Sequence, residues 1–232
     1  MLLAAIRVCG CARLFPASVG IGPEWKRALG NKADPLIMER VATQAIPKVT
    51  EEEYLRLERP AERKSEFVGG EIFAMAGGSV VHSLLAMNWG VELGSKLRGR
   101  GCHVFSSDAR IRTPVTGSFL YPDVSVVCGG WRLHEGAGDI LTNPRVIIEV
   151  LSPSTADYDR GRKFELYREI PELAEYILVH ADSPHVEQFT RQPDASWIFR
   201  EYRGLEASVA LTSIDCVIRF ADVYAGVFEL PA

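Results

Sequence analysis

An acidic residue interrupts an otherwise apolar stretch between Arg145 and Leu151. The run Arg-Val-Ile-Ile-Glu-Val-Leu is typical of a β-strand buried on both faces, and Glu149 lies within it. A buried carboxylate without a partner costs several kcal/mol, so it must take up a proton, pair with a cation or bind a metal ion. Glu149 is therefore the first candidate for chemistry.

A second carboxylate, Asp123, occurs in a similar setting. It follows Pro122, which we expect at the start or edge of a strand that continues to Val127. Because side chains alternate along a strand, Asp123 should share a face with Ser125 and Val127. If this strand neighbours the Glu149 strand, the two carboxylates converge, and with a backbone carbonyl they form the oxygen site that Mg²⁺ or Mn²⁺ prefers.

A lysine follows at a useful distance. The segment 152–155 reads as a turn and helix cap. In the predicted helix after it, Asp159, Lys163 and Tyr167 are spaced four residues apart and so lie on one face. Lys163 could therefore return over the strand end and meet the carboxylates. Glu66, in a predicted hairpin, is a fourth candidate.

Each candidate also has a purely structural explanation, which the sequence leaves open. Glu149 could form an ion pair, and Asp123 could be a turn residue. Lys163 could be a solvated helix lysine paired with Asp159, and Glu66 a solvated residue beside a hairpin.

For three other features the structural explanation is preferred. We expect His82, at the start of a long predicted helix, to be a partly buried structural histidine. We expect Tyr167 to pack in the core with its hydroxyl in water. Four arginines could contact phosphate groups but are most simply a solvated surface: Arg98, Arg100, Arg110 and Arg112.

Composition excludes several classes of protein. Hydrophobic residues make up 47% of the 232 residues and aromatic residues 9%, so disorder throughout is excluded. No apolar run reaches the roughly 18 residues of a membrane span, so we expect no membrane partner. With a net charge of -4, a nucleic-acid partner must be argued from a local patch or metal chemistry. Five scattered cysteines argue against a disulfide framework and for a reducing compartment, hence a cytoplasmic location.

The chain divides into two unequal parts. Residues 1–46 form an N-terminal extension whose sequence shows no lasting helical or strand periodicity. We expect this extension either to be disordered or to result from a start codon assigned in error upstream of Met38. A secretory signal is the poorer interpretation because no basic residue precedes the apolar start. Residues 47–232 are expected to form one compact domain.

Within that domain, helices and strands alternate. We expect helices over 50–59, 80–98, 155–169 and 221–228, and a hairpin over 64–75. Strands are expected over 102–112, 118–128, 145–151, 174–180, 185–190, 197–203 and 216–220. This order indicates an α/β (α+β) fold, with helices packed on the faces of a sheet.

These motifs resemble a known family. Pro122-Asp123, the run from Glu149 to Thr155, the run Asp159-Arg160-Gly161-Arg162-Lys163 with Tyr167, and Glu175 to Val179 are similar to the signature of the Uma-type restriction endonucleases. The run from Glu66 to Ile72, and His82, also fit. The resemblance covers residues 48–228. The Glu149 run combined with Lys163 is fairly specific, whereas Pro-Asp alone is weak.

The resemblance implies the PD-(D/E)XK nuclease-like superfamily, with a restriction-endonuclease-like central mixed β-sheet flanked by helices. It implies that Asp123, Glu149 and the carbonyl of Val150 hold Mg²⁺ or Mn²⁺, with Glu66 as an outer or second-metal ligand. The chain departs from the superfamily pattern at Leu151, where a lysine normally stands, and Lys163 is the expected replacement.

The function implied is metal-dependent hydrolysis of DNA phosphodiester bonds. The alternative is a nuclease-like fold that binds nucleic acid or a protein partner without cutting, which Leu151 favours. A homodimer would suit the cutting of two strands, although the sequence shows no interface signature.

Overall fold

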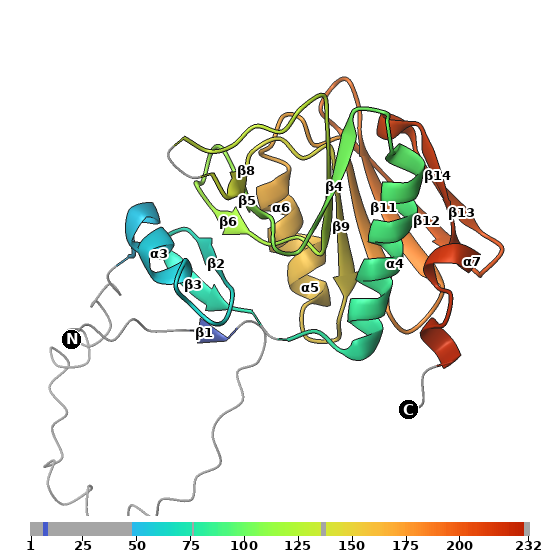
Figure 1. The fold of residues 1–232 in the computed structure, drawn as a ribbon, viewed down its shortest axis with the longest axis horizontal. Helices are drawn as coiled ribbons and strands as arrows, with labels where there is room; N and C mark the ends of the chain where they lie inside the picture. The colour runs from blue at the N-terminus through green and yellow to red at the C-terminus, as the bar shows by residue number, and fades with distance from the viewer. Residues whose placement is uncertain (1–6, 9–47, 76, 136–137, 230–232) are drawn as a thin grey trace, which may run out of the picture.

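The central feature of the computed structural model is a six-stranded mixed sheet, sheet B, covered on both faces (Figure 1). The structure describes residues 7–8, 48–75, 77–135 and 138–229. The strand order in sheet B is β12-β11-β10-β9-β7-β4. Its strands are β4 (Cys102–Ser106), β7 (Val124–Cys128), β9 (Val146–Leu151), β10 (Glu175–His180), β11 (His185–Arg191) and β12 (Trp197–Arg203).

Strand β9 lies in the middle of sheet B, as its apolar sequence predicts. All six of its residues are buried. It runs parallel to β10 and antiparallel to β7, and the other pairs in this sheet are antiparallel. The sheet is therefore mixed, and the expected α/β fold with a central mixed sheet is confirmed.

A second sheet, sheet A, lies beside the first, with strand order β1-β3-β2-β6-β5-β8. Two segments that the sequence predicts as single strands are divided between the sheets. Residues 102–112 form β4 in sheet B and a strand in sheet A, and 118–128 divide in the same way at Pro122. The strands of sheet A are β1 (Arg7–Val8), β2 (Ser65–Val68), β3 (Glu71–Ala74), β5 (Arg110–Arg112), β6 (Phe119–Leu120) and β8 (Ile140–Leu141).

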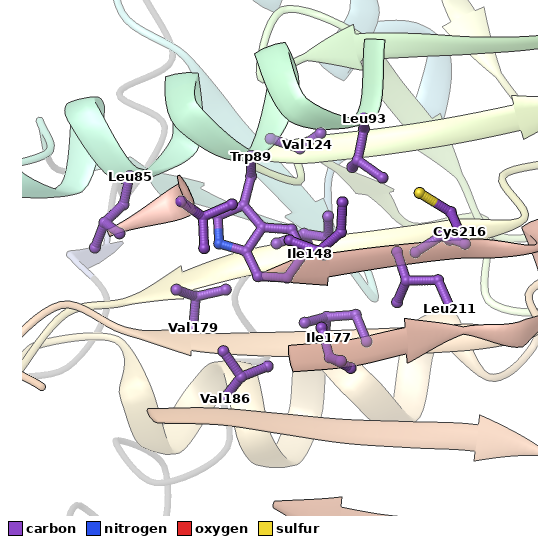
Figure 2. Close-up of a cluster of buried hydrophobic side chains, with 14 of the residues drawn as sticks. Leu85, Trp89, Leu93, Val124, Ile148, Ile177, Val179, Val186, Leu211 and Cys216 are labelled. Carbon is purple, nitrogen blue, oxygen red and sulfur yellow. The ribbon is translucent and has the colours of Figure 1, made fainter. Parts of the chain in front are cut away.

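Helix α4 (Val80–Leu97) covers one face of sheet B. Ser79 caps its start by accepting a hydrogen bond from the His82 N–H. Leu85, Trp89 and Leu93 are fully buried at helical spacing and point toward the strands (Figure 2). They pack against alternate residues of β7, β9 and β10 in the larger core cluster.

The opposite face of sheet B is covered by the predicted helix 155–169, which is not a uniform α-helix. It consists of α5 (Ala156–Tyr158), a π-helical turn (Asp159–Lys163) and α6 (Phe164–Tyr167). The second core cluster lies under this segment and includes Tyr167, Tyr176 and Leu178. Sequence periodicity places the helix correctly but does not predict its π-turn.

The remaining elements complete the covering layers. Thr50 caps α3 (Glu51–Glu58) as predicted, by accepting from the Glu53 N–H. A hairpin of β13 (Ser208–Leu211) and β14 (Cys216–Arg219) joins the α4 side of the core, and β13 was not predicted. Short helical segments are Thr212–Ile214, α7 (Phe220–Val223) and Val227–Glu229.

Two expectations concern the cysteines and the N-terminus. The prediction of no disulfide framework needs correction, because the β4–β7 register places Cys102 opposite Cys128 and the two form a disulfide. Apart from β1, which pairs with β3, the expected extension 1–46 lies outside the described residues. Among the described helices, none is long and apolar enough to cross a membrane.

Candidate active site

The antiparallel pairing of β7 and β9 brings two predicted site residues together. Val124 pairs with Ile148, so Asp123 lies beside Glu149 at one end of the strands. The Val150 N–H donates to Asp123 Oδ2 at 2.7 Å, and the Asp123 N–H lies 3.4 Å from Glu149 Oε2. Glu149 is on the α6 side of the sheet, because the residues two positions before and after it on β9 share its face and belong to the second core cluster. Asp123 lies just before β7, at the strand end, where it also contacts His82 of α4.

The buried side chain of Lys163 reaches this pair from the π-turn. Its Nζ lies 2.8 Å from Glu149 Oε1, 3.3 Å from Glu66 Oε1 and 3.7 Å from Asp159 Oδ1. It also donates to the carbonyl of Tyr121 at 3.3 Å. Lys163 is therefore not a solvated helix lysine. Leu151, where the superfamily pattern has lysine, is buried in the second core cluster instead.

Glu66 enters the site from sheet A. It lies on β2 and is buried, accepting hydrogen bonds from the Tyr121 N–H at 3.2 Å and the Tyr158 hydroxyl at 3.0 Å. The explanation of Glu66 as a solvated hairpin residue is thus wrong. Sheet B alone does not supply all the carboxylates around Lys163.

His82 is partly buried, as the sequence predicts, and it also contacts the candidate site. Its Nε2 lies 3.1 Å from Asp123 Oδ2, because the first turn of α4 meets the end of β7. The hydrogen bond to Asp123 raises the pKa of His82, outweighing the opposing effect of burial. The sequence places His82 in the capped first turn of a helix. That position does not indicate which residues from distant segments, such as Asp123, the ring contacts.

Asp159 and Tyr167 complete the surroundings of Lys163. Asp159 is buried, and its spacing of four residues from Lys163 was the signal that could have identified it. The Tyr167 hydroxyl was expected to face water, but it does not. It donates to Glu149 Oε1 at 3.2 Å, while its ring packs in the second core cluster.

Negative charge exceeds positive charge in this cluster. The carboxylates are Glu66, Asp123, Glu149 and Asp159, whereas Lys163 and His82 are the cationic partners. Burial raises the pKa of Glu149 well above the usual range, although Lys163 acts in the opposite direction. Burial also tends to lower the pKa of Lys163, but the surrounding carboxylates outweigh it and hold that pKa high.

The donor set fits a hard divalent cation. Carboxylate oxygens from Asp123 and Glu149 come from adjacent strands, and the excess negative charge would be offset by a dication. Such an ion would compete with the Lys163 ammonium for the Glu149 carboxylate.

A different group also brings potential metal ligands together. Among the described residues, His180, His185 and Glu187 place one ligand atom each within 4.8 Å of one another. Arg160 already binds this carboxylate, with its Nη2 2.8 Å from Glu187 Oε1. The Arg160 guanidinium therefore already supplies positive charge to the carboxylate of this group.

Three of the four arginines considered for phosphate contacts have partners within the protein. Arg100 binds Asp215, and Arg112 binds Glu51. Arg110 is buried and donates to the Tyr121 hydroxyl at 2.8 Å. The prediction of a solvated surface is wrong for Arg110, and these pairings weaken the case for phosphate contacts from Arg100 and Arg112.

Comparisons with known proteins agree with this architecture. Two uncharacterized proteins of Synechocystis sp. are 37% identical over 169 residues and 34% identical over 181 residues. These matches cover 73% and 78% of this chain, and 94% of each relative. A crystal structure described as a "putative nuclease" from Anabaena variabilis superposes with a TM-score of 0.65 at 18% identity, covering 77% of this chain and 99% of that one.

The family comparison covers the same part of the chain. The model of the Uma2 family, described as "Putative restriction endonuclease", matches residues 51–217, which include every candidate site residue. At 18% identity the structural likeness concerns the fold alone, which is nuclease-like. Because the family match spans most of the chain, the protein belongs to the Uma2 family.

Proposed function

We propose that this protein is a divalent-metal-dependent endonuclease that hydrolyses DNA phosphodiester bonds. One observation carries the proposal: the Lys163 ammonium and the Asp123 and Glu149 carboxylates, from three separate segments, meet at one end of the central sheet. The family description and the fold of the neighbour support a nuclease.

The metal ligands in this proposal are Asp123, Glu149 and the carbonyl of Val150. Glu66 acts as an outer or second-metal ligand, and Mg²⁺ or Mn²⁺ is the expected ion because the donors are oxygens. When bound, the ion withdraws charge from the scissile phosphate and lowers the pKa of a water molecule.

The protein side chains then have defined tasks. Lys163 orients the attacking water or stabilises the charge that builds on the phosphate oxygens, for which its position beside Glu149 is suited. His82 and the Val150 N–H hold the Asp123 carboxylate in place. In the reaction, a bond forms between water oxygen and phosphorus, a phosphorus–oxygen ester bond breaks, and the departing oxygen gains a proton.

The test is cleavage of supercoiled plasmid with Mg²⁺ or Mn²⁺. We expect nicking by the wild type, strong loss of nicking with Asp123→Asn or Glu149→Gln, and retention with the control Glu201→Gln. Glu201 is a half-exposed carboxylate on β12 that pairs with His185 and Arg203. Equal nicking by the wild type and both site variants would indicate contamination and would overturn the proposal.

A second candidate function is nucleic-acid binding without cleavage. Leu151 in place of the usual lysine favours it, as does the engagement of Lys163 by three carboxylates in the structure. Retarded migration of a DNA fragment without cleavage, in the presence of Mn²⁺, would support this candidate against the first. DNA cleavage by itself would not determine whether the protein is a homodimer. Sedimentation of the purified protein measures its oligomeric state.

A further inference from the structure

A second charged cluster lies on the same face of sheet B as the candidate active site. Register aligns Glu149 on β9 with Leu178 on β10, and Leu178 with Glu187 on β11. Residues paired in this way across a sheet point to the same side. Glu149 and Glu187 are therefore two carboxylates of one row, about 10 Å apart at two strand spacings.

Glu187 is held by two partners. Arg160 donates to it from Nε at 3.1 and 3.3 Å and from Nη2 at 2.8 Å, a two-oxygen contact that fixes the guanidinium. The His180 Nε2 lies 2.7 Å from Glu187 Oε1. Burial acts to raise the pKa of Glu187, but the bonds from Arg160 and His180 outweigh it and lower that pKa. Glu187 is therefore an ionised, buried anchor point.

The same π-turn spans both carboxylates. Arg160, near the start of the turn, binds Glu187, whereas Lys163, at its end, binds Glu149. At the first residue of the turn, the Tyr176 hydroxyl donates to the backbone carbonyl of Asp159 at 2.9 Å. The turn is thus fixed to the sheet at both ends, and its orientation decides where the Lys163 ammonium lies.

The π-turn itself needs such fixing. It widens a helix that is regular on either side, and π-turns of this kind occur frequently at functional sites. A widened turn without strong tertiary contacts could return to α-helical geometry, which would change the direction of the Lys163 side chain relative to Glu149 on the sheet. Arg160 is the basic residue of the turn that reaches the sheet outside the active site.

We propose that Arg160 and Glu187 are positioning residues for Lys163. Their ion pair sets the register of the π-turn on the sheet, and through it the placement of the ammonium group in the reaction. This inference rests on the proposed nuclease function, because the consequence of the positioning is a rate of DNA cleavage.

The test compares Glu187→Gln with Glu175→Gln. Glu175 is a buried carboxylate of the same sheet, and it binds Gln188 and the Ser213 N–H. We expect Glu187→Gln to lower the single-turnover rate of plasmid nicking by about 10- to 100-fold, as small misplacements of a catalytic group do. Mn²⁺ affinity, measured by calorimetric titration, should stay within about twofold of wild type, because the lost Arg160–Glu187 ion pair includes none of the proposed metal ligands.

A conservative exchange separates positioning from mere support of the fold. Arg160→Lys keeps the charge and should retain more cleavage than Arg160→Gln, when both are compared at equal thermal stability. If Glu187→Gln loses no more rate than Glu175→Gln, or if rate and Mn²⁺ affinity fall together, the inference is overturned.

A readout that needs no activity distinguishes failure of this inference from failure of the proposed function. If the wild type does not cut DNA, the proposed function fails, and the NMR resonance of the Lys163 Nζ still reports its surroundings. Its shift in Glu187→Gln, but not in Glu175→Gln, would support the positioning role. An unchanged resonance in both variants would overturn it.

Discussion

Lys163 is the residue on which the charge balance of the site depends. Its ammonium is buried and contacts Glu149, Glu66 and Asp159 within 4 Å. A buried charge that loses its partner is strongly destabilising, more so than the loss of an exposed ion pair. The lysine therefore supports the fold as well as the proposed chemistry.

Replacing Lys163 should reveal this double role. We expect Lys163→Ala to lower the free energy of unfolding by about 3–5 kcal/mol without metal, because it leaves buried carboxylates unpaired. Mn²⁺ should restore part of that loss by supplying positive charge. Urea unfolding with and without Mn²⁺ measures both effects, and Lys96→Ala, at a partly exposed pair with Glu92, is the control. A loss that Mn²⁺ leaves unchanged would contradict the shared site.

Glu149 should be indispensable for metal binding. We expect Glu149→Gln to weaken Mn²⁺ binding by at least about 10- to 100-fold, the loss seen even for outer partners of metal ligands. The fold should persist, since the amide keeps the size of the side chain. Calorimetric titration gives the affinity and circular dichroism the fold. Unchanged affinity would remove Glu149 from the proposed ligand set.

Metal binding should also depend on pH through Glu149. Burial raises the pKa of this carboxyl, so it loses its proton at a higher pH than an exposed glutamate does. A cation needs the ionised form, so Mn²⁺ affinity should rise as pH increases toward the raised pKa, with release of a proton. Titrations in two buffers of different ionisation enthalpy, between about pH 5 and about pH 8, count the protons. An affinity independent of pH over that range would contradict this linkage.

At the scale of elements, local patterns predicted most of the helices and strands. The apolar run around Glu149 predicted β9, and the antiparallel pairing of β7 and β9 brings Asp123 beside Glu149. The cap at Thr50 predicted the start of α3. Patterns of this kind depend on neighbouring residues, and they succeed where local sequence and tertiary contacts agree.

What the sequence could not predict depends on contacts between distant segments. The division of residues 102–112 between two sheets follows from strand pairing, which periodicity does not specify. The role of His82 likewise depends on where α4 meets β7. The four-residue spacing of Asp159 and Lys163 is visible in the sequence. The π-turn between them, which decides the direction of the Lys163 side chain, is not.

The loop before α4 sets the position of His82, which allows a test with neighbouring glycines. A Cβ at Gly78 would lie 2.8 Å from His82 Nδ1, whereas one at Gly77 would meet no atom within 4 Å. We expect Gly78→Ala to displace the ring from Asp123, so that the raised pKa of His82 falls toward its ordinary value. Gly77→Ala is the matched control.

The measurement is an NMR titration of the His82 ring. Protonated His82 is favoured by Asp123, so this contribution to stability is present at low pH and is lost as pH rises through the raised pKa. Equal pKa values in Gly78→Ala and Gly77→Ala would show that the loop does not position the ring.

At the scale of the whole molecule, the site is an assembly of both sheets. Glu66 comes from sheet A, whereas Glu149 comes from sheet B and Lys163 from the helical layer that covers it. Contacts between residues nearly a hundred positions apart therefore close the cluster. Its geometry depends on the cooperative fold rather than on any single segment.

The disulfide should stabilise that fold from the opposite end of β7. Cys102 and Cys128 tie edge strand β4 to β7 and close a loop with a sequence separation of 26. On the chain-entropy model, a loop of this length contributes about 3–4 kcal/mol by restricting the unfolded chain. We expect dithiothreitol to lower the free energy of urea unfolding by about this amount.

The double variant Cys102→Ala/Cys128→Ala is the control for that reduction. It should unfold at the same urea concentration with and without dithiothreitol, since the remaining described cysteine, Cys216, is free and buried. Mn²⁺ affinity of the reduced wild type should stay unchanged, because Asp123 lies at the other end of β7 from Cys128. A fall in Mn²⁺ affinity on reduction would show that the edge strand and the site are coupled, against this expectation.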